Sequence, residues 1–139
     1  MRIDLTKYHI FSRISIYILA VILLCIGAYH LAKPNDLFVF VPFFLPGGVQ
    51  WAYLVGVCFI LVGISFITNY YVKLTSYLLS FFLFFFVFTV HVPNFLNAAV
   101  AEMRTFALIN ILKDTAIGAF ALHIAAGAHH QHLHFENND

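Results

Sequence analysis

The sequence predicts an all-α integral membrane protein, a bundle of four transmembrane helices, and three observations support this fold class. Of the 139 residues, 63% are hydrophobic and 9% are charged, and the mean hydropathy is +0.93. A soluble domain is about half apolar and about a quarter charged, so this chain has too few polar side chains to cover a surface in water. Four apolar stretches are each long enough, at about 1.5 Å per helical residue, to cross a hydrocarbon core about 30 Å thick. The 17 phenylalanines are also typical of a surface that faces lipid.

The first predicted span covers about residues 10–31 and ends before Pro34, because a proline disfavours helical geometry in the residue that precedes it. No small-residue cleavage site follows this span, so we expect a retained helix rather than a signal peptide. Residues 33–50 contain the apolar run LFVFVPFFLPGG, which Pro42 and Pro46 interrupt. This run is too short to cross the bilayer. We therefore expect a short interfacial or re-entrant loop between the first two spans, with its backbone covered by protein.

Three further spans are predicted at about residues 51–68, 72–92 and 103–126. In the first of these, Gly56 and Gly63 are seven residues apart and share a helix face. Two glycines on one face allow another helix to approach closely. We therefore expect this face to pack against a neighbouring helix.

The span over residues 72–92 combines a partly polar stripe with a run of phenylalanines, and a tight turn at residues 69–71 precedes it. The rest of this helix is mainly Phe and Leu and is expected to face lipid, while Pro93 and its neighbours are expected to end the helix. Four side chains fall near one face at helical spacing: Ser76, Ser80, Val87 and His91.

The four spans are predicted to form a single domain over residues 1–128, followed by a polar segment over residues 129–139. We expect this segment to be a solvated, mobile tail. Its histidines could chelate a transition metal weakly, but they have no cysteine or second cluster to complete a site. These weak metal candidates are His129, His130, His132 and His134.

Several function classes are excluded by composition and by missing motifs. The net charge is +1 and there is no basic patch, so nucleic-acid binding is not expected. Cys25 and Cys58 are far apart and form no C-x-x-C motif, so we interpret them as small buried hydrophobes. The sequence has no nucleophile triad, zinc motif, phosphate loop or dinucleotide fingerprint. We therefore do not expect the chain to be catalytic alone.

Charge also predicts the orientation in the membrane. Four spans place both termini on the same side, and lysines and arginines are more frequent near span ends on that side than on the other. Because cytoplasmic loops are enriched in these residues, both termini are predicted to be cytoplasmic. The residues counted are Arg2, Lys7, Arg13 and Lys73 on the terminal side, against Lys33 and Arg104 on the other.

Lys113 and Asp114 lie at the middle of the fourth span, where each charge costs about 3 kcal/mol by conservative scales. They are therefore expected to face protein, a ligand or a wet cavity. Because neighbouring helical positions diverge by about 100°, we do not expect the two side chains to face each other, whereas Asn110 is within reach of both. One hypothesis is a pocket for a quinone carbonyl, a proton or a head group. The other is an ion pair that fixes packing, for instance between Asp114 and Arg13, although Arg13 could instead extend to cytoplasmic head groups.

His30 and His91 are predicted near the outer ends of their helices, at matched depth. Glu102 and Arg104 open the fourth span on that side, so these four side chains could converge beneath the apolar loop. Two such histidines could bind a metal, ligate haem or move a proton, but histidine at a helix end is more often an interfacial residue. Haem is not favoured, since it would need both histidines deeper in the bundle and His123 lies far from them.

The motifs and their order resemble the DoxX-like family of small four-helix membrane proteins over nearly the whole chain. The first helix ends in G-x-x-H-x-x-x-P (residues 27–34), and the loop contains V-P-F-F-L-P (residues 41–46). The third helix ends in H-V-P-N-F (residues 91–95), and the last contains N-I-L-K-D-x-x-x-G (residues 110–118). The individual motifs are loose, so the resemblance depends on their order and spacing.

This resemblance implies a four-helix bundle of bacterial inner membranes. Members of the family are described as subunits of quinone-linked oxidoreductases, including thiosulfate–quinone systems, or as membrane partners of redox enzymes. The lysine of the last helix would correspond to Lys113, and the arginine early in the first helix to Arg13. Asp114 and the histidine-rich segment depart from the family pattern, so the resemblance does not specify the chemistry.

Three functional hypotheses follow. The first is a membrane subunit that binds a quinone or similar lipophilic ligand, or anchors a redox partner; Lys113 would donate to a ligand carbonyl, and His91 or His30 would handle protons. The second is a structural or assembly protein without a ligand. The third is a small-solute transporter, for which four helices leave little room unless the chain forms a homo-oligomer. All three place the protein in a lipid bilayer.

Overall fold

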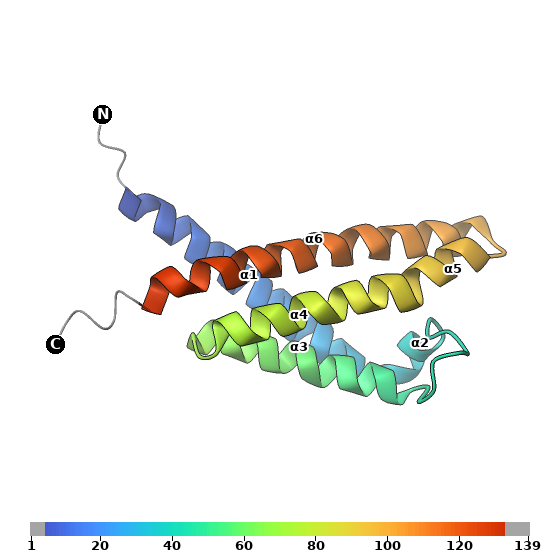
Figure 1. Ribbon diagram of the computed structural model, residues 1–139. Helices are drawn as coiled ribbons and strands as arrows, with labels where there is room; N and C mark the ends of the chain where they lie inside the picture. Colours follow the sequence, from blue (N-terminus) through green and yellow to red (C-terminus); the bar gives the residue numbers. More distant parts are fainter. Residues whose placement is uncertain (1–4, 133–139) are drawn as a thin grey trace.

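The computed structural model describes residues 5–132, which are helical along most of their length (Figure 1). No strand occurs within this range. The elements, in chain order, are α1 (Leu5–Ala32), α2 (Pro34–Phe38), α3 (Gln50–Thr68), α4 (Val72–Phe86), the π-helical turn η1 (Val87–His91), α5 (Val92–Asn97) and α6 (Ala101–His132).

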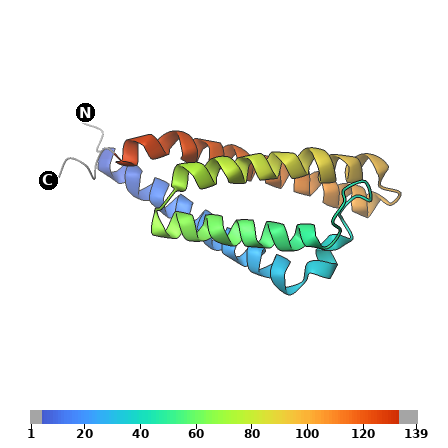
Figure 2. The ribbon, with the colours of Figure 1, turned by 60° about the horizontal axis from the view of Figure 1, so that its bottom comes forward.

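Four of the helical segments are long and apolar enough to cross a membrane: Ile10–Ala32, Gln50–Thr68, Val72–Asn97 and Ala101–Ala128. The protein is therefore an all-α, four-helix integral membrane protein, and the predicted fold class is confirmed. α1 begins and α6 ends at the same end of the bundle, as an even number of spans requires (Figures 1 and 2).

The third span was predicted over about residues 72–92, with Pro93 and its neighbours ending the helix, but it continues through Pro93 to Asn97. Proline lacks an N–H, and its ring clashes with the carbonyl four residues earlier in an α-helix. That earlier residue, Thr89, belongs to η1, where the wider π-helical turn gives the ring room. Proline then occupies the first turn of α5, a position that does not need its missing N–H.

The helices pack as two pairs, α1 with α3 and α4 with α6, which the α3–α4 turn joins. As predicted, the two glycines of α3 face a neighbour closely: a Cβ atom on Gly56 would lie 3.0 Å from the Gly27 carbonyl oxygen, and one on Gly63 would lie 3.1 Å from that of Ala20. Larger residues would push α1 and α3 apart. The tight turn is also as predicted, with Asn69 and Tyr71 in the left-handed conformation.

A packed core fills the half of the bundle nearest the α3–α4 turn, and all four long helices contribute to it. Small and branched side chains dominate this core, as is typical where helices approach closely in a membrane. Its buried residues are Leu19, Ala20, Leu23, Phe59, Val62, Phe66, Val72, Leu79, Leu83, Ala121 and Ile124. Ser76 and Ser80 on α4 are also buried, whereas Phe81 and Phe88 point outward.

The loop of residues 39–49 lies at the opposite end of the bundle, with α2 (Figures 1 and 2). Phe43 and Phe44 are exposed on it, which fits an interfacial loop that touches lipid. Protein contacts hold the loop from within: Asn94 Nδ2 donates to the Phe40 carbonyl oxygen at 2.8 Å, and Trp51 Nε1 donates to that of Pro46 at 2.7 Å. The loop therefore closes this end of the bundle.

Candidate functional site

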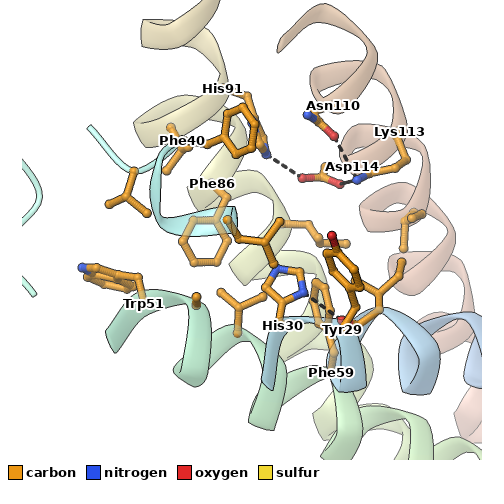
Figure 3. A pocket seen from close by; sticks show the side chains of 18 of the residues that line it. Tyr29, His30, Phe40, Trp51, Phe59, Phe86, His91, Asn110, Lys113 and Asp114 are labelled. Atoms are coloured by element: carbon orange, nitrogen blue, oxygen red, sulfur yellow. Dashed lines mark hydrogen bonds and ion pairs between the residues drawn. The ribbon is translucent and has the colours of Figure 1, made fainter. Parts of the chain in front are cut away.

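A cavity of about 370 Å³ lies between the two helix pairs, in the half of the bundle nearest the loop. This volume is within the range of small-molecule sites, about 300–1,000 Å³. Apolar side chains from all four long helices form most of its wall, and Leu37, Phe40 and Val41 close it toward the loop. We call this space the inner cavity (Figure 3).

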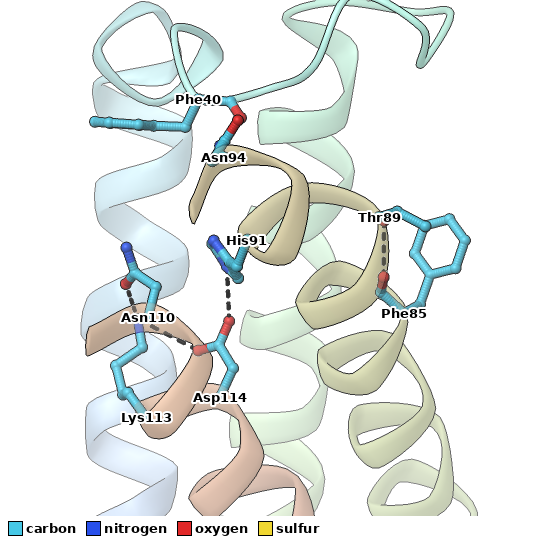
Figure 4. A network of polar contacts seen from close by, with 8 residues as sticks. All are labelled: Phe40, Phe85, Thr89, His91, Asn94, Asn110, Lys113 and Asp114. Atoms are coloured by element: carbon cyan, nitrogen blue, oxygen red, sulfur yellow. Dashed lines mark hydrogen bonds and ion pairs between the residues drawn. The ribbon is translucent and has the colours of Figure 1, made fainter. Parts of the chain in front are cut away.

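A chain of four polar side chains forms one wall of the inner cavity (Figures 3 and 4). His91 Nε2 lies 3.0 Å from Asp114 Oδ2. The Lys113 ammonium nitrogen lies 3.3 Å from Asp114 Oδ1 and donates to Asn110 Oδ1 at 3.0 Å. The chain therefore runs without a break from His91 on η1 to Asn110 on α6. We call these four side chains the polar wall.

Local helix geometry places each member of the polar wall. Asn110, Lys113 and Asp114 occupy positions i, i+3 and i+4 of α6, which lie on one side of a helix. His91 is the last residue of η1, and the π-helical turn rotates it relative to a continuous α-helix. The sequence spacing on α6 predicted that Asn110 is within reach of Lys113 and Asp114. No simple sequence rule predicts a π-helical turn, so the position of His91 could not be predicted in this way.

The expectation that Lys113 and Asp114 would not face each other is wrong. Their backbone positions do diverge, but the four-carbon lysine side chain is long and flexible enough to bend back to the neighbouring carboxylate. The lysine side chain remains 46% exposed, whereas that of Asp114 is only 10% exposed. Lysine therefore lies at the rim of the cavity, and aspartate lies within the wall.

His30 on α1 lines the inner cavity across from the polar wall (Figure 3). Its Nδ1 lies 2.8 Å from the Ile26 carbonyl oxygen, and a carbonyl only accepts, so Nδ1 carries a hydrogen. In the neutral ring, Nε2 is therefore a hydrogen-bond acceptor. The edge of the ring also contacts Phe59, with the two ring centroids 5.8 Å apart.

Three charged residues singled out in the sequence lie away from the cavity. Arg13 is exposed on α1, and the suggested pair with Asp114 does not form, since the aspartate pairs with His91 and Lys113. Glu102 is exposed on the first turn of α6. Arg104 is exposed as well, and its Nη2 donates to the Ala98 carbonyl oxygen at 3.5 Å. Of the four side chains expected to converge beneath the loop, only the two histidines line the inner cavity.

The remaining histidines are not part of this site. His123 stacks on Phe120 and is exposed. The weak metal candidates His129, His130, His132 and His134 lie outside the residues whose side chains the structure describes. Within the described residues, no group of three or more His, Cys, Asp or Glu side chains comes together.

Sequence reasoning missed several aromatic residues of the cavity. Trp51, in the first turn of α3, lines the inner cavity and stacks on Phe85, with ring centroids 6.1 Å apart. Tyr29 follows two residues after Gly27 and was not singled out, yet it also lines the cavity and is 51% exposed. No local sequence pattern indicated either position, because both depend on how the two helix pairs pack against each other.

Comparison of the chain with protein-family models, with curated protein sequences and with solved structures finds no match. Function must therefore be inferred from the geometry of the site.

The polar wall can bind an uncharged, hydrogen-bonding head group. Asp114 neutralises the Lys113 ammonium, so the wall does not call for a free anion. Lysine has three N–H donors, and Asp114 and Asn110 occupy two of them, which leaves one for a ligand. Because Tyr29 and Lys113 are both partly exposed on the rim, the cavity also reaches the lipid-facing surface between α1 and α6. An apolar tail has a way out on this side.

Proposed function

We propose that this protein binds a quinone, or a similar lipophilic ligand with carbonyl groups, as a DoxX-like subunit or partner of a redox system in the bacterial cytoplasmic membrane. Both termini would face the cytoplasm. The observation that carries the proposal is the inner cavity: apolar on most sides, polar on one, and open to lipid at a rim formed by Tyr29 and Lys113.

A quinone matches each part of this cavity. Its flat ring suits walls formed by Phe59, Phe86 and Phe106, since aromatic rings stack favourably. One carbonyl oxygen would accept a hydrogen bond from the free N–H of Lys113. The apolar tail would extend into the lipid between α1 and α6. A partner protein of the redox system would carry out the electron transfer.

A structural role is the second candidate, because the bond between His91 and Asp114 joins η1 to α6. In this case the polar wall would only fix the packing of α4 against α6. Removing a charge would then lower stability without any effect that depends on a ligand.

The test uses Trp51, the single tryptophan of the chain, which lines the inner cavity. Decylubiquinone should quench its fluorescence saturably in detergent. Lys113→Met should weaken this binding by about tenfold, the equivalent of one hydrogen bond to a charged donor. Lys113→Arg should retain most of it. Lys33→Met removes an exposed lysine that does not line the cavity and is the matched control, with unchanged affinity expected.

Quenching that rises linearly with quinone, equally in all four proteins, would show only partition into the micelle and would contradict the proposal. Equal affinity in the wild type and Lys113→Met would remove the lysine from the site. Thermal unfolding of the unliganded proteins separates the structural candidate, which predicts a lower midpoint for Lys113→Met and no stabilisation of any variant by quinone.

A further inference from the structure

A second cavity of about 250 Å³ lies next to the first, at the end of the bundle where α5 and α6 meet. Its lining includes Asn97, Ala99 and Met103, which are exposed, so this space reaches the surface of the protein. It lies beyond the apolar middle of the helices, at the end of the bundle opposite to the α3–α4 turn. We call it the outer cavity.

The two cavities share a wall formed by four side chains, Phe40, His91, Phe106 and Asn110, which line both of them. The rings of Phe40 and Phe106 stack with centroids 4.9 Å apart and close the apolar part of this wall. Lys113 and Asp114 line only the inner cavity. A proton that passes from the outer cavity to Asp114 must therefore cross the shared wall.

His91 is the one titratable residue of the shared wall, because the other three are two phenylalanines and an asparagine. Its Nε2 contacts Asp114, and its Nδ1 has no hydrogen-bond partner among the residues that the structure describes. An imidazole can take a proton on one nitrogen and release one from the other. The other titratable side chains that line the two cavities are Tyr29, His30, Lys113 and Asp114, all on the inner side.

We propose that His91 is a proton-transfer residue that connects the outer cavity, which reaches the surface at the end of the bundle, with Asp114 and a ligand in the inner cavity. This inference rests on the proposed quinone binding and deepens it. Protons would exchange only with the membrane face at which α5 meets α6, which is the face opposite to the start of α1 and the end of α6.

The chemical step balances in atoms and electrons. Reduction of a bound quinone takes two electrons from an external reductant and two protons, one for each carbonyl oxygen. A hydronium ion in the outer cavity protonates Nδ1 of His91, Nε2–H passes its proton to Asp114 Oδ2, and the protonated carboxyl group donates to the carbonyl oxygen that faces the polar wall. The hydrogen then lies on Nδ1, and exchange with water in the outer cavity moves it back to Nε2, which restores the starting tautomer. The same cycle delivers the second proton when the second oxygen of the ligand faces the wall, and the quinol is the only product.

The experiment measures the rate of quinone reduction in protein films on an electrode, which supplies the electrons directly. The wild type is loaded with decylubiquinone and compared with His91→Ala and His91→Gln. Each protein is measured at saturating decylubiquinone, as judged by Trp51 fluorescence, and the bound quinone should be reduced about tenfold or more slowly in both variants, the usual effect of losing a proton-transfer group. Glutamine keeps a hydrogen-bond donor for Asp114 but cannot relay a proton, so it also serves if the alanine variant fails to fold.

Added imidazole should restore the rate of His91→Ala, because the outer cavity connects the vacated position with water. His30→Ala and His123→Ala are the controls: one removes a histidine that lines only the inner cavity and the other an exposed histidine. Imidazole should not raise the rate of either variant.

Wild-type rates in both His91 variants would overturn the proton pathway while leaving quinone binding intact. A slow His91→Ala that imidazole does not accelerate would overturn it as well, because the site would then have no connection to water. If the wild type does not bind the quinone at all, the proposed function itself fails.

Discussion

The two halves of this bundle are built differently, although the same four helices form both. In the half near the α3–α4 turn, side chains as small as Ala20 and Ala121 are fully buried and the helices touch. In the half near the loop, the helix pairs enclose a cavity of about 370 Å³ with a polar wall. The packed half buries small hydroxyl groups such as Ser76, whereas the hollow half holds the titratable residues His91 and Asp114.

This difference indicates a division of labour between stability and binding. In a bilayer, helices associate through van der Waals packing, because lipid is as apolar as the protein interior. A cavity forfeits such contacts, so the hollow half contributes less to stability per residue than the packed half. A ligand that fills the cavity would restore the missing contacts, which is the physical reason to expect one there.

The largest expected effect comes from replacing a buried alanine by leucine, once in each half, and comparing the stability of the two variants. Ala121→Leu inserts three carbons into a packed core and should lower the free energy of unfolding by about 2–3 kcal/mol. Ala52→Leu inserts the same atoms at a buried position that lines the inner cavity, so it should change stability by less than about 1 kcal/mol but abolish saturable quinone binding. Unfolding in mixed micelles and Trp51 quenching measure the two properties. Equal destabilisation by both variants would contradict the claim that one half of the bundle is packed and the other is hollow.

A smaller effect is expected from the polar contacts of the two halves. A double-mutant cycle with His91→Ala and Asp114→Ala should give a coupling free energy of about 1 kcal/mol, near the upper part of the range for membrane proteins. The matched cycle in the packed half uses Ser65→Ala and Thr75→Ala, whose hydroxyl oxygens lie 2.8 Å apart. Because neither hydroxyl is charged, its coupling should be about half as large. A larger coupling for the hydroxyl pair would show that the polar wall is not a strong interaction.

The smallest effect is predicted for Ser76→Ala. The Ser76 hydroxyl is fully buried and has no hydrogen-bond partner within the described part of the chain. Since a buried hydroxyl without a partner is unfavourable, its removal should raise the free energy of unfolding by about 0.5 kcal/mol. The same unfolding experiment checks this value, and a clear loss of stability would show that the hydroxyl has a partner in the folded protein.

The sequence predicted the architecture well because the bilayer constrains it strongly. Span length, the glycine face of α3 and the turn at residues 69–71 each follow from local rules of spacing and conformation. The unexpected continuation of the third span beyond residue 92 depends on η1, whose π-helical turn accommodates Pro93. Such a turn has no periodic signature comparable to that of an α-helix, so the residues around Pro93 predicted a helix end instead.

The site was predicted only in part. Charge at mid-span identified Lys113 and Asp114, since any ionisable group at that depth needs a partner. The identity of the partner could not be predicted, because His91 and Asp114 are 23 residues apart and meet only through the packing of α4 against α6. The same limit applies to Trp51, whose position in the cavity depends on how the two helix pairs diverge.

The central claim is that the inner cavity holds one quinone-class molecule. Native mass spectrometry of the protein extracted in mild detergent, and again after incubation with decylubiquinone, tests it directly. We predict one bound molecule of quinone mass per chain in the wild type and none in Ala52→Leu, whose fold is retained. The same adduct in both proteins, or no adduct in the wild type after incubation, would contradict this claim.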